Sequence, residues 1–257
     1  MFSTLKTEFG SCSSMPFEIS VPLGSAPVTS RPHHLNTILA KEVDAALNHY
    51  LAAGLIQHST SPYSRPLVVI PKTSGGVKIT VNYKKLNEIS TLSQLSIPRV
   101  DQVLDSLGSG EVFSLFDLVS SFHQIKAHKD TVPLTTFCTP TGLCEWRVMP
   151  QSSSGSPGWF VKVINEVIKG LKQVAAYLDD VIVFDSDPIA HVQTIRSLFE
   201  RLREHNIKLC PSKARLVSAD ANFLGHSISP AGLRPNAEKV SALIDVPMPT
   251  DVKQVRA

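Results

Sequence analysis

The order of apolar and polar residues along the chain predicts an alternation of helices and strands. After residue 35, five apolar side chains recur at helical spacing, namely Leu39, Val43, Leu47, Tyr50 and Leu51. Asn36 or Thr37 precedes this stripe as a candidate N-cap, and Gly54 follows it as a stop signal. We therefore expect a helix between these signals.

The period then changes to that of a strand. The segments "RPLVVIPK" and "GVKITVNYKKLN" flank the Gly75-Gly76 pair. In the second segment apolar and polar residues alternate, with Val77, Ile79, Val81 and Tyr83 against Lys78, Thr80, Asn82 and Lys84. This alternation predicts a β-hairpin with one buried face and one basic, polar face.

Four further patterns predict two helices, a strand and a second hairpin. "RVDQVLDSLGSG" (99–110) predicts a short helix, and "EVFSLFD" (111–117) predicts a strand that ends on Asp117. After Pro157 an apolar stripe predicts another helix, and "AAYLDDVIVF" (175–184) predicts a hairpin that follows it.

A last helix is expected after Asp187, which is suited to the N-cap, with Pro188 in the first turn. Its apolar stripe includes Val192, Ile195, Phe199 and Leu202. Residues 1–35 are rich in Ser and Pro and predict an extended arm with at most one short strand. The order of elements indicates an α+β fold.

Composition is that of an ordinary globular protein. The 257 residues are 42% hydrophobic and 18% charged, and the net charge of +3 is too small to indicate a polyanion partner. Four cysteines lack CxxC spacing, which argues against a zinc site and a disulfide framework. No signal peptide or membrane span is evident, so we expect a soluble, cytoplasmic protein in a reducing compartment.

The distribution of charge is more informative than its sum. No acidic residue lies between Asp44 and Glu88, whereas five basic residues fall within that stretch: Arg65, Lys72, Lys78, Lys84 and Lys85. Such a stretch suits phosphate groups. A solvated lysine face is the alternative.

Asp179 and Asp180 stand at the turn of the second hairpin. Aspartate is common in turns, so a plain polar turn is one interpretation. If Asp117 ends a neighbouring strand, however, three carboxylates converge on one sheet surface, a donor set that suits Mg²⁺. A pair of such ions is used for in-line displacement at phosphorus, and the basic hairpin would then hold a triphosphate.

Five segments, in this order, resemble blocks of the reverse transcriptase of gypsy-type LTR retrotransposons, which is similar to the retroviral enzymes. They are "SPYSRPLVVIPKTSGGVKITVNYKKLN" (61–87), "SLFDLVSSFHQI" (114–125), "RVMP" (147–150), "YLDD" (177–180) and "NFLGHSIS" (222–229). The resemblance covers about residues 35–257. Each segment alone is weakly specific, but five in order are strongly so.

The resemblance implies a right-hand polymerase fold with fingers and palm, an antiparallel sheet packed on helices, and a truncated thumb. The implied divisions are an N-terminal arm (1–35), fingers (36–98 and 126–156), palm (99–125 and 157–235) and the start of the thumb or connection (236–257). The palm would carry the YLDD hairpin and the primer grip. No protease, ribonuclease H or integrase motif is recognisable, so the chain resembles a fragment of a Pol polyprotein.

The same resemblance implies the roles of individual residues. Asp117, Asp179 and Asp180 would be the catalytic carboxylates and metal ligands, joined by the backbone carbonyl of Leu118. Two Mg²⁺ ions are implied, with Mn²⁺ as a substitute. The implied nucleotide contacts are Lys72, Lys78, Ser120, Ser121, Phe122 and Gln151, and the implied primer grip is Phe223, Leu224, Gly225 and His226.

Two of these residues have plainer interpretations. Phe122 would be an aromatic gate that excludes a ribose 2′-hydroxyl, or else an ordinary core aromatic. His226 would contact the primer, or else be a satisfied surface histidine. Implied partners are an RNA or DNA template with its primer, deoxynucleoside triphosphates and the remaining polyprotein segments, with no membrane. Retrotransposon particles in the cytoplasm are the implied location.

The chain also departs from the family pattern. It has Asn82 where members usually carry Asp, Lys84 where they carry Arg, and Ser152 where they carry Gly. A side chain at Ser152 would stand where backbone must approach the nucleotide or template. An alternative to an active polymerase is therefore a retroelement remnant that only binds nucleic acid, and an RNA-dependent RNA polymerase is a third hypothesis.

Overall fold

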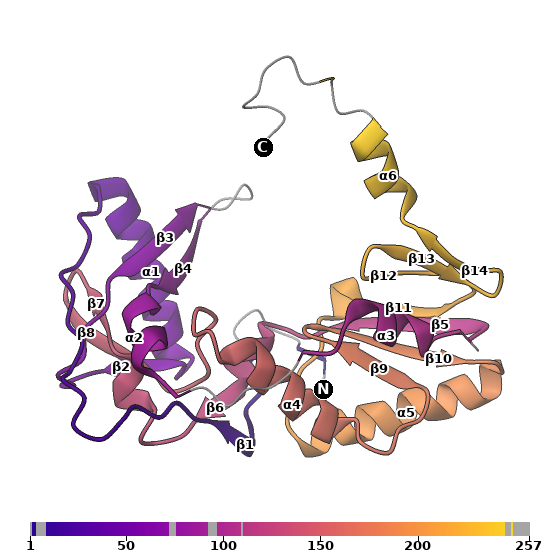
Figure 1. Ribbon diagram of the computed structural model, residues 1–257, viewed down its shortest axis with the longest axis horizontal. Helices are drawn as coiled ribbons and strands as arrows, with labels where there is room; N and C mark the ends of the chain where they lie inside the picture. The colour runs from indigo at the N-terminus through magenta and orange to yellow at the C-terminus, as the bar shows by residue number, and fades with distance from the viewer. Residues whose placement is uncertain are drawn as a thin grey trace.

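The computed structural model describes residues 2–3, 9–71, 76–91, 97–108, 110–244 and 248. They form two lobes joined by a pair of parallel strands (Figure 1). We use the name hairpin lobe for the described residues of 36–91 and 131–150, and sheet lobe for those of 97–118 and 156–235. No helix among the described residues is both long enough and apolar enough to span a membrane.

The sheet lobe is built on a four-stranded antiparallel sheet in the order β11-β5-β10-β9. The strands are β11 (Arg215–Ser218), β5 (Val112–Asp117), β10 (Asp180–Asp185) and β9 (Val174–Tyr177). Side chains of β10 alternate between two apolar clusters, with Val181 and Val183 on one face and Ile182 and Phe184 on the other. Because both faces are buried, the strand has a continuous apolar run.

Helices cover one face of this sheet, and smaller elements cover the other (Figure 1). Helices α4 (Ser156–Val167) and α5 (Pro188–Glu204) contribute to the first apolar cluster. The second cluster contains residues of α3 (Val100–Asp105) and of the small antiparallel sheet β12 (Ala221–Phe223), β13 (His226–Ser229) and β14 (Gly232–Pro235). Helix α6 (Ala237–Ile244) follows β14 and projects away from the sheets (Figure 1).

The hairpin lobe contains two small antiparallel sheets. One is the pair β3 (Leu67–Pro71) and β4 (Val77–Val81), and the other has the order β2-β8-β7. The bounds are β2 (Ile56–His58), β8 (Gly142–Trp146) and β7 (Phe137–Thr139), with helices α1 (Thr37–Ala52) and α2 (Lys84–Ile89) beside them. In β4 the predicted alternation is confirmed, since Val77, Ile79 and Val81 are buried and Lys78 is exposed.

The two lobes are connected through β1 (Cys12–Phe17) of the N-terminal arm and β6 (Ile125–Ala127), which pair in parallel. Two short 3₁₀ turns flank β6 in the chain, at Ser121–Gln124 and Val132–Thr135, and another lies before β11, at Pro211–Lys213. Within its described residues the arm forms one strand and two isolated bridges, as the sequence predicted. The arm therefore packs along the junction of the lobes.

The helix boundaries follow the capping signals. The Asn36 side chain accepts a hydrogen bond from the Leu39 amide (2.8 Å), and Gly54 adopts a φ of +68° just after α1. The Asp187 carboxylate caps α5 by accepting from the Ala190 amide at 2.8 Å. Both predictions are confirmed.

The predicted apolar stripe of α5 is partly wrong. Val192 is 53% exposed, whereas His191, Leu198 and Leu202 are buried. The inward face begins one position earlier than expected because a polar residue, His191, occupies its first turn. A pattern that counts only apolar residues does not detect such a position.

Candidate active site

The end of the β5–β10 strand pair brings two carboxylates opposite each other. Asp117 is the last residue of β5 and Asp180 the first of β10, and the two are paired in register. Asp179 lies in the preceding turn, where Leu178 has a φ of +50°. The Leu118 amide donates to the Asp179 carbonyl at 2.9 Å, so the turn is attached to the continuation of β5. The three aspartates thus lie at the same end of the sheet.

One ammonium group partly balances these carboxylates. Lys213 Nζ donates a hydrogen bond to Asp117 Oδ2 at 2.8 Å, and the lysine side chain is 63% exposed. This bond raises the pKa of Lys213. Lys213 is a residue that the sequence reasoning missed, because it lies far along the chain from Asp117 and in no recognised pattern.

Asp180 lies in an unfavourable electrostatic environment. Partial desolvation, followed by the negative charges of Asp117 and Asp179, raises the pKa of its carboxyl, and Lys213 acts in the opposite direction. The residue as a whole is still exposed at the start of β10, whereas the rest of the strand is buried. A bound cation would relieve this repulsion, and that fits a site for divalent metal ions.

Asp179 is oriented by a neighbouring hydroxyl. Ser121 Oγ donates to Asp179 Oδ1 at 2.6 Å, and the serine is buried at the start of a 3₁₀ turn. Ser120 precedes it in a left-handed conformation, with a φ of +43°. Ser121 therefore positions a carboxylate in this state, and its predicted contact with a nucleotide stays a prediction.

Among the described residues, no three acidic, histidine or cysteine side chains are already arranged as a metal site. The hydrogen bonds above give the reason, because Asp179 is directed to Ser121 and Asp117 to Lys213. The donor set is nevertheless one of hard carboxylate oxygens, which suits Mg²⁺ or Mn²⁺ and not zinc.

Phe122 follows Ser121 in the 3₁₀ turn that contacts this end of the sheet. The Phe122 ring is half-buried and packs against Phe160, with ring centroids 5.4 Å apart. The next residue, His123, is buried, and burial lowers its pKa to about 4, with a smaller contribution from the charge of Lys78. The field of Lys78 therefore reaches the turn that carries Phe122. Lys72 lies outside the described residues.

The loop before α4 is attached to the hairpin lobe. The Val81 amide of β4 donates to Ser152 Oγ at 3.2 Å, and the Ser154 amide donates to Asn87 Oδ1 at 3.2 Å. Gln151, the predicted nucleotide contact, is exposed in this loop. The Ser152 side chain thus lies against the free edge of β4. The Val81 amide therefore has a hydrogen-bond acceptor in the Ser152 hydroxyl, which a glycine at position 152 would lack.

Another departure from the family pattern also has a local role. Asn82 Oδ1 accepts a hydrogen bond from the Lys84 amide at 3.1 Å, where α2 begins. An Asx turn of this type can be made by either Asp or Asn. The change from Asp to Asn at this position is therefore compatible with the local backbone.

The predicted primer grip is a tight turn between β12 and β13. Leu224 and Gly225 both have positive φ, at +50° and +79°, which is the backbone of a two-residue hairpin turn. His226 Nδ1 lies 3.2 Å from the Leu224 carbonyl, and His226 is half-buried. Phe223 is buried in the second apolar cluster, so of the four residues it is the least able to contact a ligand.

At the other end of the same strand pair, a buried polar network was also missed. His191 Nδ1 lies 2.9 Å from Asp185 Oδ2, and Nε2 lies 2.8 Å from Ser114 Oγ. The Val217 amide donates to Ser114 Oγ (3.0 Å), and Thr194 Oγ1 donates to Asp185 Oδ1 (3.1 Å). Both ring nitrogens of His191 therefore have hydrogen-bond partners.

This Asp-His-Ser arrangement is not a hydrolytic site. Asp185, His191 and Ser114 are 7%, 0% and 1% exposed, so no substrate carbonyl can reach the hydroxyl. The network instead joins β5, β10, α5 and β11. It thereby supports both strands that carry the site carboxylates.

Comparison with known proteins places these features in a family context. A family model described as "Reverse transcriptase (RNA-dependent DNA polymerase)" matches residues 70–228. The chain is 35% identical over 240 residues to the retrovirus-related Pol polyprotein from transposon 297 of Drosophila melanogaster, covering 91% of this chain and 23% of the relative. It is 25% identical to the transposon Tf2-3 polyprotein of Schizosaccharomyces pombe, covering 94% and 18%. The chain thus spans less than a quarter of these relatives.

Solved structures share the fold. The foamy viral protease-reverse transcriptase in complex with RNA/DNA hybrid superposes with a TM-score of 0.89 at 21% identity, over 99% of this chain and 34% of that one. The same viral protein in complex with double-stranded DNA gives a TM-score of 0.90, over 99% and 53%. Both lobes and their relative arrangement are therefore those of a known architecture.

Proposed function

The chain belongs to the reverse transcriptase (RNA-dependent DNA polymerase) family, and from that premise we propose that it catalyses template-directed transfer of deoxynucleotides to a primer 3′-hydroxyl. The family resemblance inferred from five sequence segments is confirmed, as is the α+β polymerase fold. The proposed activity is supported chiefly by one observation, the in-register pairing of Asp117 with Asp180 beside Asp179.

In this proposal the three aspartates would hold two divalent cations, and the Leu118 carbonyl would add a backbone ligand. When bound, Mg²⁺ ions, or Mn²⁺ in their place, supply Lewis-acid stabilisation of charge that develops at phosphorus. Ser121 orients the Asp179 carboxylate through its hydroxyl. Lys213 keeps a positive charge next to Asp117. Charge is thereby arranged before the substrate arrives, which is the main source of electrostatic catalysis.

Substrate binding is assigned to the two lobes. We propose that residues 36–98 and 126–156, which include the hairpin lobe, form the fingers. Residues 99–125 and 157–235 would form the palm, and residues 236–257 would begin a thumb. Lys78, together with Lys72, would bind the triphosphate, and the exposed basic face of β4 supports this role. Ser120, Phe122 and Gln151 would surround the sugar, with the Phe122 ring excluding a 2′-hydroxyl.

The nucleic-acid partner is proposed to be an RNA or DNA template with an annealed primer. The foamy viral relatives of known structure are complexes with RNA/DNA hybrid and with double-stranded DNA. The turn Leu224-Gly225 with His226 would contact the primer terminus. Since the curated relatives are polyproteins, the remaining polyprotein segments are proposed as further partners.

Primer extension tests this function. The unmodified chain should add deoxynucleotides to a DNA primer on an RNA template in Mg²⁺, and Asp179→Asn should lower the rate by about 1000-fold. Asp105→Asn is a matched control, because Asp105 is exposed on α3 and has no side-chain partner among the described residues. Activity that survives Asp179→Asn would contradict the assigned site, and a chain that binds primer and template without any incorporation would contradict the function.

A further inference from the structure

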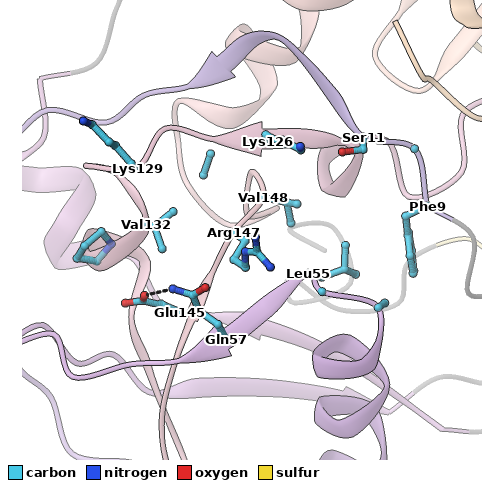
Figure 2. Close-up of a pocket in the computed structure, with 15 residues that line it drawn as sticks. Phe9, Ser11, Leu55, Gln57, Lys126, Lys129, Val132, Glu145, Arg147 and Val148 are labelled. Atoms are coloured by element: carbon cyan, nitrogen blue, oxygen red, sulfur yellow. Dashed lines mark hydrogen bonds between the residues drawn. The ribbon is translucent and has the colours of Figure 1, made fainter.

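A hollow lies away from the three aspartates, none of which lines it. It has a volume of about 900 Å³ and is bordered by β2, β6, the end of β8 and the N-terminal arm. In Figure 2 the Arg147 side chain lies in the middle of this hollow, with Lys126 of β6 on one side and the Gln57–Glu145 pair on the other. The volume is within the range of ligand-binding pockets.

Three cations line this hollow, and we name them the basic hollow residues: Lys126, Lys129 and Arg147. All three are exposed. Their side chains form no ion pair or hydrogen bond with any residue in the described part of the chain. By contrast, Lys213 is paired with Asp117 and Lys169 with Glu166. The positive charge in the hollow is therefore available to a ligand.

One carboxylate lines the same hollow, and its oxygens are already occupied. Glu145 Oε1 accepts from Gln57 Nε2 at 2.7 Å, and Oε2 accepts from Ser59 Oγ at 2.6 Å and from Thr136 Oγ1 at 3.3 Å. Glu145 is 7% exposed, so it is directed into the lobe. The residues that line the hollow include three cations and one carboxylate, so their net charge is +2.

Arg147 is held rigidly between two strands. Its amide donates to the Leu55 carbonyl and its carbonyl accepts from the Ala127 amide, both at 2.9 Å. Lys126 forms a bridge with Val148, the residue after Arg147. Both cations are therefore presented from fixed backbone, which lowers the entropy lost when a ligand is bound.

The opposite wall is also fixed. Gly10 has no room for a Cβ atom, because the Gln124 side chain and the Asn206 carbonyl occupy that space. The Ser11 amide donates to the same Asn206 carbonyl at 2.9 Å. These contacts hold the arm in place and set the Phe9 ring at the edge of the hollow, where it meets His49 edge-on at 6.2 Å.

We propose that this basic hollow is an accessory site for single-stranded nucleic acid, separate from the aspartate site. Arg147 and Lys126 bind backbone phosphates, and a base stacks at Phe9, which is half-buried at the edge of the hollow. A positive groove with an adjoining aromatic ring is the usual way to hold a single strand without regard to sequence. The proposal takes its ligand class from the proposed function but does not require polymerisation.

Fluorescence anisotropy with a labelled single-stranded oligonucleotide of about 12 nucleotides tests the site. Excess unlabelled blunt duplex is present, so that the primer–template site is filled. The double variant Arg147→Gln, Lys126→Gln should weaken binding at least about tenfold and reduce the salt slope by about 1.4, the value for two phosphate contacts. The affinity of Arg147→Lys should lie between those of the unmodified chain and the double variant, because lysine keeps the positive charge but lacks the planar guanidinium group.

The matched control is Arg203→Gln, Lys41→Gln, which removes the same charges from exposed positions outside the hollow. It should bind like the unmodified chain. Equal affinity of the two double variants would overturn the proposal. Competition by ATP or pyrophosphate at the same phosphate concentration as the oligonucleotide would also overturn it, by showing a site for free phosphates. The rate of primer extension on a short duplex should be the same in both double variants as in the unmodified chain. If none of the three proteins extends the primer, that result counts against the proposed function and not against the accessory site.

Discussion

Strand β10 carries an aspartate at each end, and the protein treats the two in opposite ways. Asp180, the first residue, faces Asp117 across the strand pair and is partly exposed. Asp185, the last residue, is buried and accepts hydrogen bonds from His191 and Thr194. We call these the open end and the closed end of the strand pair. Carboxylates at the open end repel each other and remain available to a cation, whereas the carboxylate at the closed end is fully used in holding elements together.

The comparison shows how one strand pair can be both rigid and reactive. The closed end satisfies its polar groups internally, as buried groups in stable proteins must be. The open end concentrates negative charge, and within the described part of the chain the exposed Lys213 is the cation paired with it. Substitutions at the two ends should therefore separate activity from stability.

The largest expected effect is on activity at the open end. Asp180→Asn should lower the rate of nucleotide incorporation by about 1000-fold, equivalent to about 4 kcal/mol, because a proposed metal ligand is lost. The free energy of unfolding should stay the same or rise, since the neutral side chain no longer repels Asp117 and Asp179. Primer extension and urea unfolding on the same preparation measure both. A marked loss of stability would break the distinction between the two ends.

The next effect concerns stability at the closed end. His191→Leu should lower the free energy of unfolding by about 3 kcal/mol, because Asp185 and Ser114 lose a buried partner. Urea unfolding measures this loss, with His34→Leu as an exposed control. The rate of nucleotide incorporation per folded molecule should change little. A rate that falls as far as in Asp180→Asn would show that the closed end takes part in catalysis.

A smaller effect distinguishes the two buried histidines. His191 has partners on both ring nitrogens, but His123 has a pKa lowered from 6.5 to about 4 by burial. Below pH 6.5 His123 binds a proton in the unfolded chain but stays neutral in the folded chain. The free energy of unfolding therefore falls as the pH drops from 6.5 towards 4. The loss should be on the order of 2 kcal/mol.

His123→Phe should abolish that part of the pH dependence while keeping the ring that stacks on Trp146 at 4.8 Å. Urea unfolding at pH 7 and at pH 4.5 compares the variant with the unmodified chain. If the free energy of unfolding falls equally in both proteins between pH 7 and pH 4.5, groups other than His123 cause the pH dependence.

The smallest predicted effect concerns selectivity beside the open end. If Phe122 is the proposed gate, Phe122→Val should raise ribonucleotide incorporation relative to deoxynucleotide incorporation by roughly tenfold, because the smaller side chain leaves room for a 2′-hydroxyl. The same change removes a ring that packs against Phe160, so stability must be measured alongside. An unchanged preference would favour the interpretation of Phe122 as an ordinary core aromatic.

The open end was predictable from sequence because its signals are local. Asp117 ends a recognisable apolar strand, and Asp179-Asp180 stand at a turn between two others. Capping signals at Asn36 and Asp187 likewise act within one helical turn. Such features depend on neighbouring residues, which a sequence pattern can represent.

The closed end was not predictable, because its contacts are not local. Ser114 and His191 are 77 positions apart, and a single serine inside an apolar strand carries no pattern of its own. The pairing of Lys213 with Asp117 was not predictable either, because the two residues are 96 positions apart. The Ser152 hydroxyl accepts a hydrogen bond from the Val81 amide of β4, a contact between residues 71 positions apart that no local pattern indicates.

The most direct test of the central claim is single-nucleotide incorporation by the unmodified chain. A DNA primer annealed to an RNA template is mixed with the chain, Mg²⁺ and each deoxynucleoside triphosphate in turn. The proposed chemistry at the open end predicts addition of the nucleotide complementary to the template, and none of the other three to a comparable extent. A folded chain that binds this primer and template but adds no nucleotide in Mg²⁺ or Mn²⁺ would contradict it.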